Sequence, residues 1–285
     1  MPESAVQHHT TRRSGFPSTL GVLRSVLGRN RELVIELSRR ELADRYIGSA
    51  LGGGWAVLAP LLTMGVYVFL FGVVFPTRFG VDSSPWLGAA LVLAGLPPWL
   101  ALVEVLTRAP GVFLANRSLV RQVVFPTEVL AARTVAATTV AWAVGSAVSL
   151  AIALVSHGFS ATMLLLPVLW ALQLAAMLGL SLLLSPIGAW LRDTREVMAF
   201  VATIGLFLTP ILFMPATLES LPRAAQVVID LNPASHMVHA YRDALVAGRF
   251  EHPWSWAIFA ATALVLLELG AFVFARAKQG IAEAL

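Results

Sequence analysis

The stretch richest in side chains that could do chemistry is residues 231–253, LNPASHMVHAYRDALVAGRFEHP. It carries three His, one Asp, one Tyr and two Arg between two long apolar runs. His236, His239 and Asp243 have the residue types of a metal site, or of a general acid and base. Because the sequence shows no additional ligand motif, polar surface on a helix is the simpler interpretation of this trio.

A short helix must position these side chains. Asn232 suits an N-cap, Pro233 suits the first helical residue, and Gly248 suits the stop. Projected on a helix, the apolar residues share one face: Ala234, Met237, Val238, Tyr241, Ala244 and Leu245. The polar residues share the other, which we expect to be wet: Ser235, His236, His239, Arg242 and Asp243. At ~15 residues this helix is too short to span the ~30 Å of a bilayer.

Composition places the helix in an integral membrane protein. The chain of 285 residues is 58% hydrophobic and 13% charged, with a mean hydropathy of +0.78. Its apolar runs are too long for the ~10-residue strands of a barrel, so we expect an all-α fold. Six transmembrane helices are predicted, at residues 51–75, 86–113, 128–156, 161–191, 197–215 and 254–275. They form one membrane domain, 29–285, after a polar tail, 1–28.

Charge gives the predicted orientation. Of the 20 Lys and Arg, sixteen fall before the first span, in the second and fourth connections, or after the last span. The positive-inside rule makes that side cytosolic, with both termini inside. Lipid headgroups therefore explain the basic pI of about 10.3 more simply than nucleic acid does, and we expect no nucleic-acid partner.

Two features suggest that the membrane domain is not a bundle of simple rods. Residues 217–230 supply a short segment before the helix described above, and together 217–248 read as a re-entrant hairpin of two short helices. Pro97-Pro98 interrupts the second span, and Pro167 and Pro186 lie near the ends of the fourth. These prolines indicate either bent packing or a broken helix that lines a cavity.

Two segments on the cytosolic side could meet a partner. Residues 29–48 are predicted to form an amphipathic helix supported by the i,i+4 pairs Glu36–Arg40 and Glu41–Arg45, which rests on anionic lipid or docks another protein. Residues 114–127 are either an ordinary basic loop or a short helix that transmits force from a partner.

Few other residues suggest chemistry. Asp193 and Glu196 lie in a tight, Arg-containing turn that does not resemble a paired-carboxylate site. Glu104 and Glu268 fall in or near spans, where an ionisable group suggests function unless it reaches the interface. The chain has no Cys, P-loop, G-x-S-x-G or H-E-x-x-H. We therefore expect no enzyme activity, bound cofactor or metal on this chain.

Taken in order, four segments resemble the permease subunit of ABC-2 type exporters, in the branch that exports O-antigen, capsule and teichoic acid. The segments are RRELADRYIGSALGGGWAVLAPLL (39–62), NRSLVRQVVFPTEVL (116–130), LRDTREV (191–197) and LNPASHMVHAYRDALVAG (231–248).

The resemblance implies an exporter of a lipid-linked polysaccharide in the bacterial cytoplasmic membrane. Two copies of this chain would join two nucleotide-binding subunits, which hold ATP and Mg. Coupling to ATP hydrolysis would fall on Arg39, Arg40, Glu41, Arg45, Asn116, Arg117, Leu119 and Arg121. The pore gate would include Asn232, Pro233, His236, His239, Tyr241, Arg242 and Asp243. Aromatic residues for the glycan path would be Trp55, Tyr67 and Trp99, with Tyr241.

Two alternatives stay open at this point. The family also exports drugs and lipids, so a small hydrophobic cargo is the nearest one. An intramembrane transferase would instead use His236, His239 or Asp243 as acid and base, and would be active without an ATPase.

Overall fold

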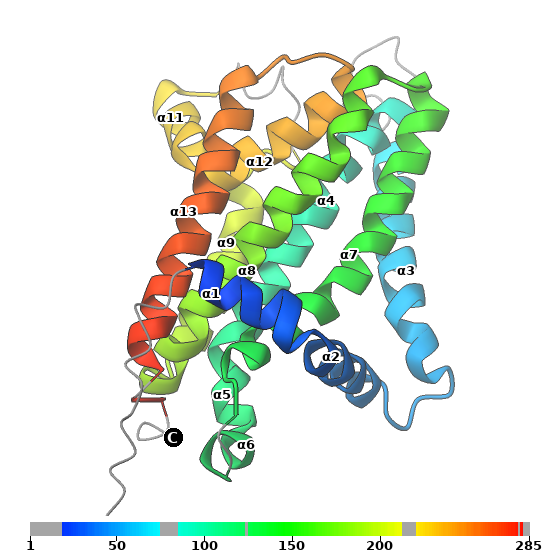
Figure 1. Cartoon of the computed structure of the whole chain (residues 1–285). Coiled ribbons are helices and arrows are strands. Elements are labelled where there is room, and N and C mark those ends of the chain that lie inside the picture. Colours follow the sequence, from blue (N-terminus) through cyan, green and yellow to red (C-terminus); the bar gives the residue numbers. More distant parts are fainter. Residues whose placement is uncertain (1–18, 75–84, 123–124, 213–220, 279, 282–285) are drawn as a thin grey trace, which may run out of the picture.

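The computed structural model describes residues 19–74, 85–122, 125–212, 221–278 and 280–281. Every regular element within these residues is a helix, which confirms the all-α prediction. Figure 1 shows long helices running side by side, with short helices at both ends of the bundle and the first helix, in blue, lying across the long ones.

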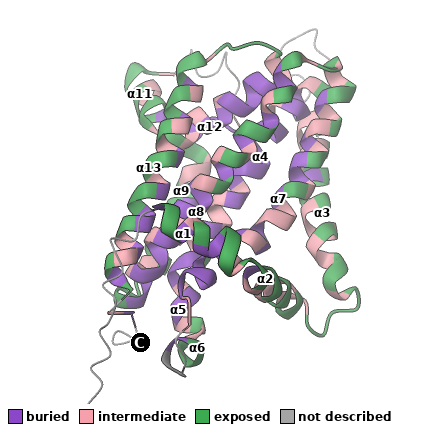
Figure 2. Cartoon of the chain, in the orientation of Figure 1, coloured by how far each residue is buried: buried purple, intermediate pink, exposed green. Residues whose placement is uncertain are grey.

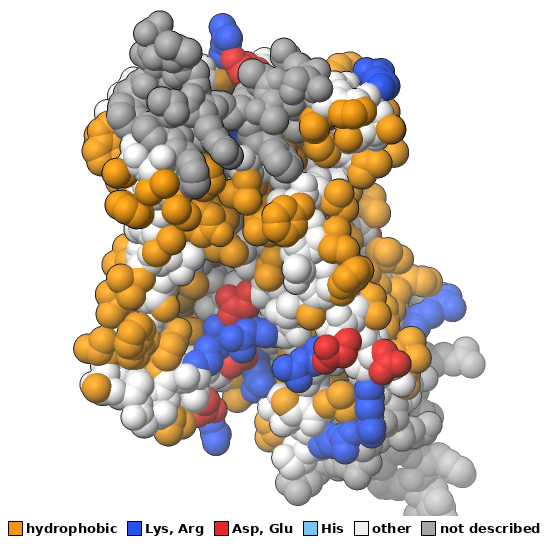
Figure 3. All heavy atoms as spheres, turned by 180° about the vertical axis from the view of Figure 1, so that it is seen from behind, with side chains coloured by type: hydrophobic (Ala, Val, Ile, Leu, Met, Phe, Trp, Pro, Cys, Tyr) orange, Lys and Arg blue, Asp and Glu red, His pale blue; other side chains and the backbone are white. Residues whose placement is uncertain are grey.

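Five helical segments are long and apolar enough to cross a membrane. They are Gly52–Val74, Trp86–Ala115, Glu128–His157, Ala161–Trp190 and Pro253–Ala277. Their main helices are α3 (Trp55–Phe69), α4 (Pro85–Arg108), α7 (Glu128–His157), α8 (Leu166–Trp190) and α13 (Pro253–Ala277). In Figure 3, hydrophobic side chains cover the middle of the molecule, and most of the visible charged side chains gather toward one end. The chain is a multi-pass membrane protein.

The predicted span at 197–215 is the exception. Here the structure has α9 (Thr194–Leu208), whose 15 residues rise only ~22 Å. The end of that predicted span, and the start of the predicted re-entrant hairpin, fall in 213–220 and so lie outside the described residues. The structure therefore supports five candidate spans and leaves the sixth as a prediction.

One end of the bundle, here called the basal end, carries the N-terminal helices and the connection between α4 and α7 (Figure 1). Its elements are α1 (Thr19–Leu23), η1 (Arg24–Arg29), α2 (Arg31–Arg45), η5 (Ala109–Gly111), α5 (Val112–Ala115) and α6 (Arg117–Gln122). The chain is thus already helical from Thr19, within the tail that the sequence separates at 1–28.

The opposite end, the far end, carries the two short helices predicted before the last span. They are α11 (Arg223–Leu231) and α12 (Pro233–Arg242), which continues into η7 (Asp243–Ala247). The predicted cap of α12 is confirmed, because the side chain of Asn232 accepts a hydrogen bond from the backbone of Ala234 at 3.0 Å. Gly248, at φ 66°, supplies the left-handed residue that ends the helix.

Packing differs strongly between the long helices (Figure 2). In α4, 72% of the apolar window is buried, whereas in the segment of α3 only 6% is. Helices α8 and α13 pack together extensively, and Gly179 and Gly270 let the two backbones touch. Helix α3 therefore lies at the edge of the chain, with a face that lipid or another protein must cover.

The paired prolines do not break α4. The helix runs without interruption from Pro85 to Arg108, through Pro97 and Pro98. Pro97 has no N–H for the carbonyl of Leu93, and the hydroxyl of Ser149 on α7 donates to that carbonyl instead, at 2.7 Å. A neighbouring helix therefore satisfies the freed carbonyl, and the bent-packing alternative fits better than the broken helix.

Candidate functional site

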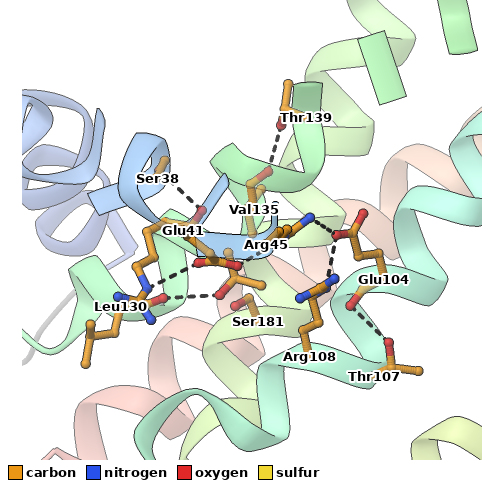
Figure 4. A network of polar contacts seen from close by, with 12 residues as sticks. Ser38, Glu41, Arg45, Glu104, Thr107, Arg108, Leu130, Val135, Thr139 and Ser181 are labelled. Atoms are coloured by element: carbon orange, nitrogen blue, oxygen red, sulfur yellow. Dashed lines mark hydrogen bonds and ion pairs between the residues drawn. The ribbon is translucent and has the colours of Figure 1, made fainter. Parts of the chain in front are cut away.

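A charged cluster at the basal end ties α2 to two long helices (Figure 4). Arg45 on α2 forms ion pairs with Glu41, one turn earlier, and with Glu104 on α4. Glu104 also pairs with Arg108, at 3.0 Å, and Glu41 pairs with Arg133 on α7, at 3.3 Å. We call these five residues the α2 clamp. It is the largest ionic network among the described residues.

The local sequence explains why the α2 clamp forms. Glu41 and Arg45, like Glu104 and Arg108, are four residues apart on a helix and therefore share a face. The predicted pair Glu41–Arg45 is confirmed, whereas the described residues show no ion pair between Glu36 and Arg40. Glu104 thus faces the basal end, where it meets two arginines rather than bare lipid.

Electrostatics keeps Arg45 charged. Burial alone would lower the pKa of Arg45, but the carboxylates of Glu104 and Glu41 raise it above its ordinary value. The side chain of Arg45 is only 15% exposed, so its carboxylate partners satisfy a charge that water reaches poorly. The clamp therefore joins α2 to α4 and α7 through ion pairs.

A second joint at the basal end is centred on Glu128, the first residue of α7. Its carboxylate accepts hydrogen bonds from Ser25 in η1 and from Lys278 just after α13, each at 2.8 Å. Further from this end along α13, Thr19 donates a hydrogen bond to Glu268. Segments far apart in sequence thus meet where the 114–127 connection enters α7.

That connection presents its own short helix at the tip of the basal end (Figure 1). The side chain of Asn116 donates to the carbonyl of Val112 at 2.7 Å and so ends α5, and α6 begins at the next residue. Arg117 and Leu119 are exposed, and the side chain of Arg121 lies outside the described residues. Of the two alternatives for 114–127, the structure therefore shows a short helix, and its contact with a partner stays a prediction.

The remaining residues predicted for coupling lie on α2. Arg39 and Arg40 are both exposed, while Glu41 and Arg45 belong to the clamp. No sequence pattern indicated a role for Arg108, Arg133 or the Glu128 joint. The i,i+4 spacing of Glu104 and Arg108 could have indicated Arg108. Arg133 and the Glu128 joint depend on tertiary contacts, which the sequence does not show.

At the far end, the expected wet face of α12 is wrong in part. Ser235, Arg242 and Asp243 are buried rather than exposed to water. Arg242 donates to the carbonyls of Leu91, at 3.0 Å, and Ile211, at 2.9 Å. The arginine therefore holds α12 against α4 and the segment that follows α9.

The partners of Asp243 also lie within the protein, at the start of α13. Its carboxylate accepts hydrogen bonds from the backbone of His252, at 2.9 Å, and from the indole of Trp256, at 3.2 Å, and lies 3.0 Å from Nδ1 of His252. It thereby anchors the start of α13. The helical projection separated polar from apolar residues correctly, but it could not show that buried carbonyls and a helix N-terminus use the polar ones.

The histidines follow the same pattern. His236 makes hydrogen bonds to Ser255, at 3.0 Å, and to the carbonyl of Asp230, at 2.9 Å. The ring of His239 stacks on that of His252, with centroids 4.3 Å apart. Atoms that could bind a metal lie within 4.8 Å of one another in a different trio, Asp243, Glu251 and His252. Asp243, the buried residue of this trio, already accepts the hydrogen bonds from His252 and Trp256.

The four aromatic residues expected along a glycan path lie on three different helices, α3, α4 and α12. Trp55 and Tyr67 are half-buried on α3, where Tyr67 stacks on Phe71. Trp99 packs under Gly205 of α9, and Tyr241 is only 2% exposed. Within one copy of the chain, Trp99 and Tyr241 are therefore buried side chains, and their place on a glycan path stays a prediction.

The α12–α13 junction should be sensitive to pH through His252. The hydrogen bond that His252 donates to Asp243 raises its pKa above the ordinary 6.5. The stabilisation is therefore complete below pH ~6.5 and is lost as pH rises through the folded-state pKa. We expect the melting temperature difference between the parent protein and His252→Gln to be largest near about pH 5 and to shrink by about pH 8.

The comparison needs a background that lacks His239. Burial, together with the charges of His252 and Arg242, lowers the pKa of His239 to about 3. His239 therefore makes the folded protein less stable as the pH falls, which opposes the effect of His252. Both proteins should therefore carry His239→Gln and be measured in the same detergent. A difference that stays constant from acid to alkaline pH would contradict a charged His252–Asp243 pair.

Comparison with known proteins identifies the family. Residues 32–246 match the family model described as ABC-2 type transporter. This segment includes the α2 clamp, the 114–127 connection and α12, and the chain belongs to that family.

Named relatives narrow the class to polysaccharide export, as the sequence resemblance indicated. The O-antigen export system permease protein RfbA of Myxococcus xanthus is 28% identical over 257 residues, which cover 90% of this chain and 96% of the relative. A protein of the same name from Klebsiella pneumoniae is 24% identical, covering 89% and 95%. The polysialic acid transport protein KpsM of Escherichia coli is 25% identical, covering 85% and 92%.

Proposed function

We propose that this chain is the membrane-spanning permease subunit of an ATP-driven exporter that moves a lipid-linked polysaccharide across the bacterial cytoplasmic membrane. The observation that carries the proposal is the match to O-antigen and polysialic acid export permeases over 85–90% of the chain. The multi-pass helical fold agrees with it.

The active assembly is two copies of this chain with two ATP-binding subunits. The nearly bare surface of α3 supports a larger assembly, since only 6% of its apolar window is buried within one copy. The basal end is cytosolic, with both termini on that side, and α9 forms the basis of a sixth crossing. ATP and Mg bind to the partner subunits, so this chain is not itself the enzyme.

Force from ATP hydrolysis enters through α6 and α2. Exposed Arg117 and Leu119 meet the ATP-binding subunit, and the α2 clamp carries the motion into α4 and α7. At the far end, α11 and α12 form the gate. Arg242 and Asp243 act there by holding α12 to its neighbours, so the gate moves together with α4 and α13.

The assembly is tested by co-isolation. The full chain is purified in mild detergent from cells that also express the ATP-binding subunit encoded nearby, and the complex is reconstituted for export. We expect both subunits in equal amounts and glycan movement only with ATP. Transferase activity from the chain alone, or failure to co-isolate with the ATPase, would refute the proposal, and export of drugs or lipids without glycan would refute the cargo.

Coupling is tested at Arg117. Arg117→Glu should lower ATP-dependent export at least ~10-fold while ATP hydrolysis continues, because reversing a charge at a contact opposes docking. The chain should still reach the membrane, since Arg117 is exposed. Arg249→Glu, an exposed arginine at the far end, serves as the matched control. Equal export by the two variants would contradict the assignment of α6.

A further inference from the structure

A cavity of about 270 Å³ lies at the basal end, bordered by the α2 clamp and by α5. Three arginines from three helices line it: Arg108 at the end of α4, Arg133 in the second turn of α7 and Arg195 in the first turn of α9. Among the described lining residues only Glu41 is acidic, so the charged side chains leave a net charge of +2. We call this cavity the arginine pocket.

Arg195 borders the pocket without a partner from its own chain. It is exposed, and the described residues give its side chain neither an ion pair nor a hydrogen bond. This holds although two acids, Asp193 and Glu196, lie within two positions of it in the sequence. A single arginine without a partner is ordinary on a protein surface. Arg195 differs because two further arginines share its cavity, so its charge adds to theirs.

The other two arginines belong to the α2 clamp but keep part of their donors. Arg108 approaches Glu104 through Nε, at 3.0 Å (Figure 4), and Arg133 approaches Glu41 through Nε, at 3.3 Å. No described residue accepts a hydrogen bond from the terminal nitrogens of either guanidinium. The side chains of Arg108 and Arg133 are 46% and 15% exposed, so a ligand can reach both. Each guanidinium can therefore still donate into the pocket.

The charge of the clamp supports the same conclusion. The clamp contains three arginines and two glutamates, so one positive charge in it is not matched. Glu41 and Glu104 are each shared between two arginines. An anion in the arginine pocket would balance this charge together with that of Arg195.

The size and lining of the pocket define the anion. Arginine nitrogens recognise the oxygens of a carboxylate or a phosphate. The volume lies just below the ~300–1,000 Å³ of sites that hold whole small molecules, so a single side chain or headgroup fits better. A lipid would also need apolar surface for its tail, but the largest apolar side chain of the described lining, Val112, is only 6% exposed. These features favour a protein carboxylate over a phospholipid.

The position of the pocket indicates which protein supplies the carboxylate. One wall consists of Gly111, Val112, Ala115 and Asn116, which lead directly into α6. Helix α6 lies at the tip of the basal end (Figure 1), and its exposed Arg117 and Leu119 are the residues to which the proposed function brings the ATP-binding subunit. A subunit docked on α6 is therefore next to the pocket.

We propose that the arginine pocket receives an acidic side chain of the ATP-binding subunit. The identity of the partner rests on the proposed function, whereas the anion-binding character of the pocket rests on the three arginines. The carboxylate of the partner would contact Arg195 together with Arg108 and Arg133. It would thereby connect α9, which the α2 clamp does not reach, to α4 and α7.

The affinity of the two proteins tests the pocket. The full chain is placed in phosphatidylcholine nanodiscs, and binding of the purified ATP-binding subunit encoded nearby is measured by biolayer interferometry at several salt concentrations. Arg195→Gln should weaken binding roughly 10-fold, as the loss of a hydrogen bond to a charged group predicts. The affinity of this variant should also depend less on salt. Its melting temperature without the partner should equal that of the parent, because Arg195 has no side-chain partner among the described residues.

The matched control is Arg192→Gln. Arg192 is also exposed and lies three positions before Arg195, but it is not among the residues that line the pocket. This variant should bind the ATP-binding subunit like the parent protein.

Charge reversal identifies the partner residue. Arg195→Glu should weaken binding further than Arg195→Gln, because it places a second carboxylate beside the incoming one. Each exposed Asp and Glu of the ATP-binding subunit is then changed to Lys in turn and tested against Arg195→Glu. We expect one of these reversals to restore most of the lost affinity.

Three results would overturn the proposal. The first is equal binding by Arg195→Gln and Arg192→Gln, and the second is the absence of any restoring reversal. The third is a loss of retained phosphatidylglycerol from Arg195→Gln in native mass spectrometry with unchanged binding of the subunit, which would make the pocket a lipid site. If the complex still forms and exports glycan in these cases, the pocket proposal fails and the proposed function stands. An ATP-binding subunit that does not bind the parent protein would overturn both.

Discussion

Gly179→Ala should destabilise the protein by about 3 kcal/mol or more, enough to remove most folded chain from detergent extracts. A methyl group at Gly179 would lie less than 3.0 Å from the backbone of Leu266 on α13. Backbone atoms cannot rotate away as a flexible side chain can, so α8 and α13 would have to separate along their whole contact. The measurement is the melting temperature and the monodisperse yield after size-exclusion chromatography.

The matched control is Gly65→Ala in α3. A Cβ at Gly65 meets nothing within 4 Å, so alanine should be neutral or stabilise the helix by up to ~1 kcal/mol. If both variants melt together, the close approach of α8 and α13 is not what holds the bundle.

Arg45→Ala should have the second largest effect, on stability and on export together. It leaves the carboxylates of Glu41 and Glu104 without their shared cation in a poorly hydrated place. Breaking a fully buried pair costs about 3–5 kcal/mol; since Glu104 keeps 21% exposure and a second arginine, we expect about 2–3 kcal/mol. ATP-dependent export should also fall more than the amount of folded protein does, because α2 loses its tie to α4.

Two comparisons isolate the clamp. Arg249→Ala breaks an exposed ion pair with Glu251, 78% and 39% exposed, and should cost little or nothing measurable. The double variant Arg45→Ala with Glu104→Ala should recover part of the stability, because no carboxylate is stranded on α4. Strictly additive losses in the double variant would mean that Arg45 and Glu104 do not interact.

Local rules explain which features the sequence could predict. The cap at Asn232, the stop at Gly248 and the Glu41–Arg45 pair each depend on residues within a few positions of one another, and all three are confirmed. The long apolar runs are equally local, and five of the six predicted spans have counterparts in the structure.

Predictions failed where a side chain's partner lies far along the chain. Polarity placed Arg242 and Asp243 on a wet face, but their partners are carbonyls on another helix and the start of α13. The ion pair between Glu41 and Arg133 carries no signal in the sequence either, because it forms only when α2 lies against α7. The site residues that depend on packing are therefore the ones that pattern analysis cannot find.

The joint at Glu128 has a practical consequence for expression work. One carboxylate holds Ser25, ahead of the first long helix, and Lys278, behind the last one. Trimming either segment, or fusing a bulky tag against it, would disturb the beginning of α7 and so the loop that leads into it. A shortened protein could thus reach the membrane normally and still export poorly, for a reason remote in sequence from the lesion.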